Sequence, residues 1–144
     1  SGAGEREGRR HIHELLEHCD TMEQFEVSIA TVRQDCLDAG ARLSLGLAME
    51  GKIPVCYSIT PFVLYRPFEF IRNYLHHEQI PVKLVGSGRD DDYGPCGFSH
   101  YACEDTKVLE ALPGIEVFRP ETKEEVDIEK FLYSGKPSYI NLRR

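Results

Sequence analysis

Short apolar runs alternate with segments of helical periodicity along most of this chain. We predict strands at residues 25–32, 52–58, 80–85, 115–118 and 138–142, and helices at 5–19, 34–49, 62–77, 104–112 and 120–132. The strands are continuous apolar runs rather than in–out alternations, which is typical of strands that are buried on both faces. The pattern therefore predicts an α/β fold, a three-layer sandwich in which helices cover both faces of a mainly parallel sheet.

The segment GPCGFSHYACED, residues 94–105, follows the strand predicted at 80–85. Ligands of parallel sheets bind at the carboxyl ends of the strands, so we expect function in this segment. Its glycines and proline exclude a regular element, and one imidazole, His100, precedes the next helix. An imidazole changes charge near neutral pH, which suits proton transfer. We expect His100 to face a cleft at the strand ends.

Glu104 and Asp105 fall in the first turn of the helix predicted after His100. Carboxylates at that place interact favourably with the helix dipole. A capping role and a catalytic role are therefore both open for this acidic pair.

Composition narrows the function classes. The chain has 144 residues, which suits one domain, and its formal charge of −7 would repel a phosphate backbone, so we do not expect nucleic-acid binding. No apolar run approaches the roughly 20 residues that span a bilayer, so we expect no membrane insertion. The five cysteines are odd in number and lack CxxC spacing, which favours reduced thiols in the cytoplasm over disulfides or a zinc site.

Three histidines in the first predicted helix, His11, His13 and His18, resemble a metal site at first sight. Residues two apart on a helix point in different directions, so a solvated helix face is the favoured interpretation. We predict no resident metal site in this chain.

From Leu43 to its end, the chain resembles the pyrimidine-binding domain of transketolase-type thiamine diphosphate enzymes. The resemblance rests on the order and spacing of LGLAMEGKIPV, FVLYRPFEFIR, VKLVGSG with GPCGFSHYACED, and LEALPGIEVFRP with PSYINLRR. We therefore expect one compact domain overall, with a divergent region at residues 1–42 and a transketolase-like pyrimidine-binding domain at residues 43–144.

The resemblance implies a cofactor site shared between two domains. A pyrophosphate domain holds the diphosphate and a divalent metal, while the pyrimidine domain holds the aminopyrimidine ring, on which aromatic side chains stack. It places His100 on a loop histidine that serves substrate oxygens or proton transfer, and it places Phe62 and Tyr65 beside the pyrimidine. Phe62, Tyr65 and Phe68 equally suit the core-facing side of a helix, so both interpretations stay open.

Several positions depart from the family's pattern. Leu37 stands where the resemblance implies the glutamate that activates the cofactor, and Asp38, or else Asp35, is the substitute that a small shift of alignment would supply. Gly88 stands in place of a second histidine, and Cys96 in place of an aspartate.

The loop after Gly88 is charged where the family has small residues, because RDDD occupies residues 89–92. Three adjacent aspartates would repel a phosphorylated sugar unless a metal or an arginine of a partner offset them.

The metal-binding signature of the pyrophosphate domain, GDG followed at a distance by asparagine, does not occur in the sequence. Thiamine diphosphate and its divalent metal would therefore be held together with a partner, in a homodimer or in a hetero-complex with a pyrophosphate-domain subunit. The leading hypothesis is a subunit, or an excised domain, of a split transketolase-like enzyme, a transferase only when so paired. The alternative is a degenerate, non-catalytic copy that acts as an interaction or assembly module.

Overall fold

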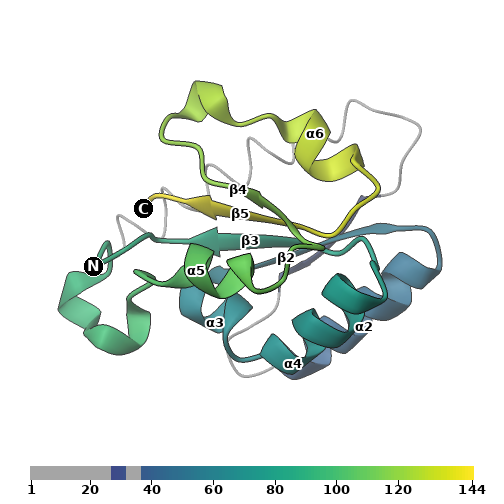
Figure 1. The fold of residues 1–144 in the computed structure, drawn as a ribbon, viewed down its shortest axis with the longest axis horizontal. Coiled ribbons are helices and arrows are strands. Elements are labelled where there is room, and N and C mark those ends of the chain that lie inside the picture. The colour runs from purple at the N-terminus through teal and green to yellow at the C-terminus, as the bar shows by residue number, and fades with distance from the viewer. Residues whose placement is uncertain (1–26, 32–36) are drawn as a thin grey trace.

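A computed structural model describes residues 27–31 and 37–144 of the chain (Figure 1). Its strands are β1 (Val27–Thr31), β2 (Ile53–Ile59), β3 (Lys83–Ser87), β4 (Glu116–Phe118) and β5 (Ser138–Leu142). They form one five-stranded sheet in the order β1-β2-β3-β5-β4, and each pair of neighbours is parallel. The helix predicted at 5–19, with its three histidines, lies outside the described residues.

Helices and short turns connect the strands. They are α2 (Leu37–Met49), α3 (Thr60–Leu64), α4 (Phe68–Phe70), the π-helix η1 (Ile71–His77), α5 (Asp105–Glu110) and α6 (Ile128–Tyr133), with 3-10 turns η2 (Gly94–Cys96), η3 (Phe98–His100) and η4 (Lys123–Glu125). Figure 1 shows α2, α3, α4 and α5 on one side of the sheet and α6 on the other. The predicted three-layer α/β fold is confirmed.

Two apolar clusters fill the spaces between these layers. The larger cluster lies between the sheet and the helices α2, α3 and α5, and its fully buried members include Leu64, Ile71, Leu75 and Val82. The smaller cluster packs α6 on the opposite face through Phe131, beside Ile140 of β5. Burial of a large apolar side chain is worth about 1.5–3 kcal/mol, so these clusters fix which face of each helix meets the sheet.

The strand predictions hold within the described residues, with one shift. Strand β3 begins at Lys83, three residues after the predicted start at Ile80. Pro81 lies between the two starts, and proline cannot donate to the hydrogen-bond ladder of a central strand. Proline is tolerated near the start of a strand, as Pro54 in β2 shows, so Pro81 marks the approach to β3 and not its interior.

Two helix predictions were wrong in their extent. The helix expected at 62–77 is interrupted, because α3 ends at Leu64 and α4 starts only after Pro67. The helix expected from Pro120 is a short 3-10 turn followed by α6, which starts later. Asp127 sets that start, since its carboxylate accepts a hydrogen bond from the amide of Lys130 at 2.9 Å and so caps the helix.

A buried polar cluster joins the carboxyl ends of the strands to the helices that follow them. The carboxylate of Asp105, fully buried at the start of α5, accepts hydrogen bonds from the hydroxyl of Tyr139 at 2.8 Å and the amide of Asn141 at 2.6 Å. Asn141 also donates to the hydroxyl of Thr60 at 3.3 Å, and Thr60 donates to the carbonyl of Gly88 at 2.7 Å. Burial, followed by the negative charge of Asp105, raises the pKa of Tyr139. Asp105 therefore has a structural role. The hydrogen bonds of this buried cluster join α3, β5 and α5 to the end of β3.

We expect Asp105→Ala to lower the free energy of unfolding by about 3 kcal/mol, because it removes the buried carboxylate that accepts hydrogen bonds from the Tyr139 hydroxyl and the Asn141 amide. Urea unfolding measures this change. Glu104→Ala, at the exposed neighbouring position, is the matched control and should stay within about 0.5 kcal/mol of the native value. Equal stabilities of the two variants would contradict a structural role for Asp105.

A buried lysine lies at the opposite end of β3. The side chain of Lys83 is 1% exposed, and its ammonium donates to the carbonyl of Lys136 at 2.5 Å and to the hydroxyls of Ser134 and Ser138 at 3.3 Å. Burial lowers the pKa of Lys83 to about 8, although the charge of Glu116 opposes the shift. Between that value and the ordinary lysine pKa, the unfolded chain keeps a proton that the folded chain has released, so folding stability gains from rising pH there.

We expect the native chain to gain about 2 kcal/mol of unfolding free energy between pH 8 and pH 10 relative to Lys83→Met, which has no proton to release. Chemical denaturation of both proteins across this pH range gives the difference. Subtracting the two curves removes the opposing contributions of thiols and tyrosines, which both proteins share. Parallel curves would show that Lys83 keeps an ordinary pKa.

Candidate functional site

The structure brings Phe62 and His100 together although they are far apart in the sequence. Phe62 lies in α3, which starts directly after β2, and His100 ends the turn η3 in the loop after β3. Strands β2 and β3 are parallel neighbours, so their carboxyl ends lie side by side. The two ring centroids are 5.0 Å apart and the ring planes are inclined by 77°, an edge-to-face contact.

The imidazole of His100 is half-buried in a small group of polar and aromatic side chains. Its Nδ1 atom lies 3.0 Å from the hydroxyl of Ser99, and the ring of Tyr93 lies 6.1 Å away between centroids. The backbone amide of His100 donates to the carbonyl of Gly97 at 3.0 Å, which closes the turn that carries the ring. His100 is therefore held in place at the strand ends and keeps part of its surface open to solvent.

Phe62 is both a core residue and a neighbour of His100. Its side chain is only 6% exposed, and the guanidinium of Arg66 lies over its ring, 4.2 Å from the centroid. The two interpretations left open by the sequence are thus compatible, since a buried ring that stands beside His100 can serve the core and a binding site.

Tyr65 is half-buried and packs against the larger apolar cluster. Its hydroxyl is buried and makes no hydrogen bond of good geometry within the described part of the chain. Burial, followed by the negative charges of Glu104 and Asp105, raises the pKa of this phenol. Tyr65 therefore stays protonated at neutral pH, and its place beside a pyrimidine stays a prediction.

Helix α2 starts at Leu37, the position where the resemblance implies a glutamate, and Asp38 is its second residue. The side chains of both residues lie outside the description. The cofactor role predicted for Asp38 stays a prediction.

Tyr93 fills the space where a side chain at position 88 would lie. Gly88 has a φ of +86°, and a Cβ atom built on it would lie 2.3 Å from Cε2 of Tyr93. The Tyr93 hydroxyl lies 3.2 Å from that of Ser87, at the carboxyl end of β3, and the guanidinium of Arg144 lies over the Tyr93 ring at 4.6 Å. The second histidine that the resemblance implies is absent, and a phenol from the following loop stands at that place.

The charged segment after Gly88 is largely neutralised by ion pairs within the chain. Asp90 pairs with Arg119 at 3.0 Å, and Asp92 lies 3.4 Å from Arg143. Arg89 points inward and is fully buried, where its guanidinium donates to the carbonyl of Asn141 at 2.7 Å and to backbone and side-chain oxygens of residues 120–121. The chain's own arginines thus offset two of the three aspartates, and the expected need for a metal or a partner's arginine is reduced.

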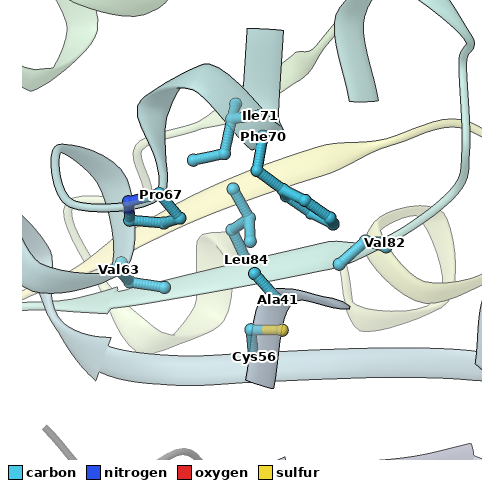
Figure 2. Close-up of a pocket in the computed structure, with 8 residues that line it drawn as sticks. All are labelled: Ala41, Cys56, Val63, Pro67, Phe70, Ile71, Val82 and Leu84. Carbon is cyan, nitrogen blue, oxygen red and sulfur yellow. The ribbon is translucent and has the colours of Figure 1, made fainter. Parts of the chain in front are cut away.

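Two hollows lie apart from this arrangement. Figure 2 shows an apolar cavity of about 20 Å³ in the core, lined by Ala41, Cys56, Val63, Pro67, Phe70, Ile71, Val82 and Leu84. An open cleft of about 290 Å³ lies where β4 ends, lined by Val117, Phe118, Arg119, Pro120, Glu125, Val126, Asp127 and Ile140. The core cavity is apolar and has room for a single water molecule at most. Neither hollow is lined by His100, so the predicted cleft beside the imidazole is not one of them.

The described residues contain no group of three or more His, Cys, Asp or Glu side chains that could hold a metal ion. The described cysteines, Cys56, Cys96 and Cys103, are free thiols, and burial raises the pKa of Cys56. Within the described ranges, no helix has both the length and the apolar character needed to cross a bilayer.

Residues 40–133 match the family described as the pyrimidine binding domain of transketolase. The chain is 35% identical over 78 residues to a putative transketolase C-terminal section from Methanocaldococcus jannaschii, which is 54% of this chain and 25% of that protein. It is 30% identical over 99 residues to one subunit of apulose-4-phosphate transketolase from Actinobacillus succinogenes, 67% of this chain and 32% of that protein. It is 29% identical over 104 residues to a 6-deoxy-6-sulfo-D-fructose transketolase subunit from a Clostridium species, which is 71% of this chain and 32% of that protein.

Two solved structures agree with these matches. A split-gene transketolase, described as an inactive beta4 tetramer, superposes with a TM-score of 0.60 and 29% identity over 78% of this chain and 35% of that chain. Transketolase from Leishmania mexicana superposes with a TM-score of 0.65, covering 74% of this chain and 16% of that one, and at 23% identity it supports the fold alone. The chain spans about a quarter to a third of the length of the curated relatives described above.

Three residues of the site were missed by sequence reasoning. The spacing of Tyr93 could have indicated its position. An aromatic residue five positions after a glycine at the end of a strand can fold back so that its ring packs over that glycine. Arg66 follows Phe62 by four residues, the spacing at which helical side chains meet. Arg89 gave no such signal, because nothing local distinguishes a buried arginine from an exposed one.

We expect Gly88→Ala to cost about 2 kcal/mol of unfolding free energy, because it combines a positive φ with displacement of the Tyr93 ring. The same substitution in a Tyr93→Ala background should cost only about 1 kcal/mol, the backbone part. Gly94→Ala is the control, since a Cβ there meets nothing within 4 Å. NMR of the His100 ring protons should show a shift in Gly88→Ala, and strictly additive energies would argue against contact between positions 88 and 93.

Proposed function

This chain belongs to the family of transketolase pyrimidine-binding domains, and we propose that it contributes the pyrimidine-side half of a thiamine diphosphate site in a split transketolase-like enzyme. The observation that carries the proposal is the edge-to-face contact of Phe62 and His100 at the carboxyl ends of β2 and β3. An aromatic ring and an imidazole, held by separate elements at the ligand-binding edge of a parallel sheet, match the needs of a flat heteroaromatic cofactor and a reacting oxygen.

Thiamine diphosphate is the cofactor that the family implies, and it supplies the nucleophilic carbon of the reaction when bound. The described side chains fit its aromatic half, because Phe62 provides a ring for the aminopyrimidine and the buried Tyr65 hydroxyl makes no hydrogen bond of good geometry in the described chain. His100 would bind substrate oxygens and move a proton there. The diphosphate and a divalent metal would be held by a pyrophosphate-domain partner.

Names of the relatives support this division of labour. Two of them are called transketolase subunits and one a C-terminal section. By analogy, we propose that this chain works in a complex with a pyrophosphate-domain subunit, in the cytoplasm, on a ketose phosphate or a 2-keto acid. The reaction would be the transfer of a two-carbon or acyl unit.

A second candidate function rests on Leu37. This residue starts α2 where the resemblance implies an activating glutamate, and a leucine can neither donate nor accept a hydrogen bond. A degenerate domain that keeps the fold as an assembly module would have this feature. The absence of a histidine at Gly88 does not add to that candidate, because Tyr93 supplies a polar ring at the same place.

Isothermal titration with thiamine diphosphate and Mg²⁺ separates the two candidates. We expect no heat from this chain alone and measurable binding once a pyrophosphate-domain subunit is added. His100→Gln in that complex should lower turnover about 10²- to 10³-fold at unchanged cofactor affinity, since general acid–base groups contribute factors of that order. His77→Gln, on the exposed end of η1, is the control for loss of an imidazole elsewhere.

If titration with thiamine diphosphate and Mg²⁺ gives no heat of binding either with or without the partner subunit, the cofactor proposal is wrong and the assembly module is favoured. A chain that remains monomeric by light scattering when mixed with the partner subunit would also contradict the proposed complex.

A further inference from the structure

Helix α2 carries an exposed face that combines apolar and charged side chains. Residues three and four apart lie on the same side of a helix, so the exposed positions between residues 40 and 50 form one surface. This surface, called the α2 face below, consists of Arg42, Leu43, Gly46, Met49 and Glu50. Leu43 is 58% exposed and Met49 is 73% exposed, although both side chains are apolar. Exposed apolar side chains that share one face are a candidate contact surface.

The opposite side of α2 attaches the helix to the sheet. Ala41, Ser44 and Ala48 are buried on that side, and the Ser44 hydroxyl lies 2.8 Å from the thiol of Cys56 in β2. These small side chains hold the helix against the strand. The α2 face therefore points away from the core and is open to a neighbouring molecule.

Gly46 lies at the centre of the α2 face. A glycine inside a helix is destabilising relative to alanine, because its backbone loses more freedom on folding. A Cβ atom built on Gly46 would meet nothing within 4 Å, and its φ is not in the left-handed region, so neither packing nor backbone conformation within this chain requires a glycine here. Close approach of a second helix would require one.

Two rows of side chains cross at Gly46. The row of residues four apart joins Arg42, Gly46 and Glu50, and the row of residues three apart joins Leu43, Gly46 and Met49. Helices pack by fitting such rows into the grooves between the rows of a neighbour. Because the side chain is missing where the rows cross, the surface has a notch at which another helix can come close.

The α2 face is also symmetric about Gly46. Leu43 and Met49 lie three residues to either side, while Arg42 and Glu50 lie four residues to either side and carry opposite charges. Suppose that two copies of the helix cross antiparallel, with a two-fold axis at the glycine. Each residue before Gly46 then faces the residue equally far after it in the other copy. Leu43 meets Met49 of the second copy and Arg42 meets Glu50 of the second copy, each twice.

Glu50 lies at an unfavourable place for a carboxylate in a single chain. Its amide donates to the carbonyl of Gly46 at 3.1 Å, so it continues the last turn of the helix, where the helix dipole is negative. The last turn of α2 contains no basic residue. A guanidinium from a second copy would offset both the carboxylate and the dipole.

We propose that the α2 face is a self-association surface on which a second copy of this chain docks antiparallel, across a two-fold axis at Gly46. The charge complementarity of Arg42 and Glu50 across that axis selects a second copy as the occupant. The proposal does not depend on the proposed function. One helix face is smaller than the roughly 1,200 Å² that stable complexes bury, so the dimer is weak, with a Kd on the order of 10–100 μM.

Sedimentation equilibrium of the full chain under reducing conditions, from about 5 to 500 μM, tests the proposal. The native chain should dimerise within this range. Arg42→Glu and Glu50→Arg should each weaken the dimer about tenfold or more, because each places two pairs of like charges across the axis. The double variant should recover the native Kd to within about threefold, because it restores both pairs with their signs exchanged.

Net charge by itself cannot produce this pattern, since the two single variants change it in opposite directions. Arg72→Glu is the matched control, because it makes the same charge change at an exposed position in η1 and should dimerise like the native chain.

Gly46→Ala gives a second, independent measurement. It should weaken the dimer about tenfold, because a methyl group on each copy separates the two helices. It should also raise the urea midpoint of the dilute chain, because alanine favours a helix over glycine. Opposite changes in association and stability distinguish a contact at Gly46 from a general loss of structure.

A chain that stays monomeric over the whole concentration range would overturn the proposal. Single variants that dimerise like the native chain, or a double variant that does not recover, would place self-association on another surface and overturn it as well. If the charge reversals leave self-association intact and weaken only binding to a pyrophosphate-domain subunit, the α2 face belongs to that partner and the proposed occupant is wrong.

Discussion

The buried carboxylate of Asp105 is the interaction on which the arrangement of the proposed site depends. It joins Tyr139 and Asn141 of β5 to the first turn of α5, and Asn141 carries the connection on to Thr60 at the start of α3. Phe62 lies two residues after Thr60, and His100 lies in the loop that runs into α5. The cluster therefore fixes the origins of both segments whose rings meet. Buried polar groups that hydrogen-bond to one another depend strongly on each other. Removing one of them leaves its neighbours without a hydrogen-bond partner in the low-dielectric interior of the protein, which is costly in free energy.

The fold could be predicted from the sequence because parallel sheets leave a simple signal. Continuous apolar runs such as IPVCY at residues 53–57 are typical of strands that helices cover on both faces, and their order along the chain with intervening helices leaves few topologies. The extent of the helices was less predictable, since Pro67 and Asp127 act locally on the backbone while apolar periodicity continues past them. Boundaries of this kind depend on single residues, whereas the existence of an element depends on many.

The site was predictable only in part, for a related reason. His100 and Phe62 could be selected because the resemblance and the position after a strand both point to them. Their contact is tertiary, and so are the insertion of Tyr93 over Gly88 and the inward turn of Arg89. From the sequence, Gly88 was the absence of a second histidine, and residues 89–92 were a run of charges that would repel a phosphorylated sugar. The structure shows instead that a neighbour fills the first position and that intramolecular ion pairs neutralise most of the second.

The loop that carries His100 is fastened at two places, by the buried guanidinium of Arg89 at its start and by the Asp90–Ala102 bridge at its end. Because the loop is attached at both ends, the conformation of its interior can change without affecting the sheet. Sequence drift or grafting between those anchors can reshape what the loop presents, including the ring of Phe98, which is 87% exposed, without disturbing the scaffold beneath. Such modularity offers one physical route by which a single domain type acquires new partners and new chemistry while its architecture stays constant.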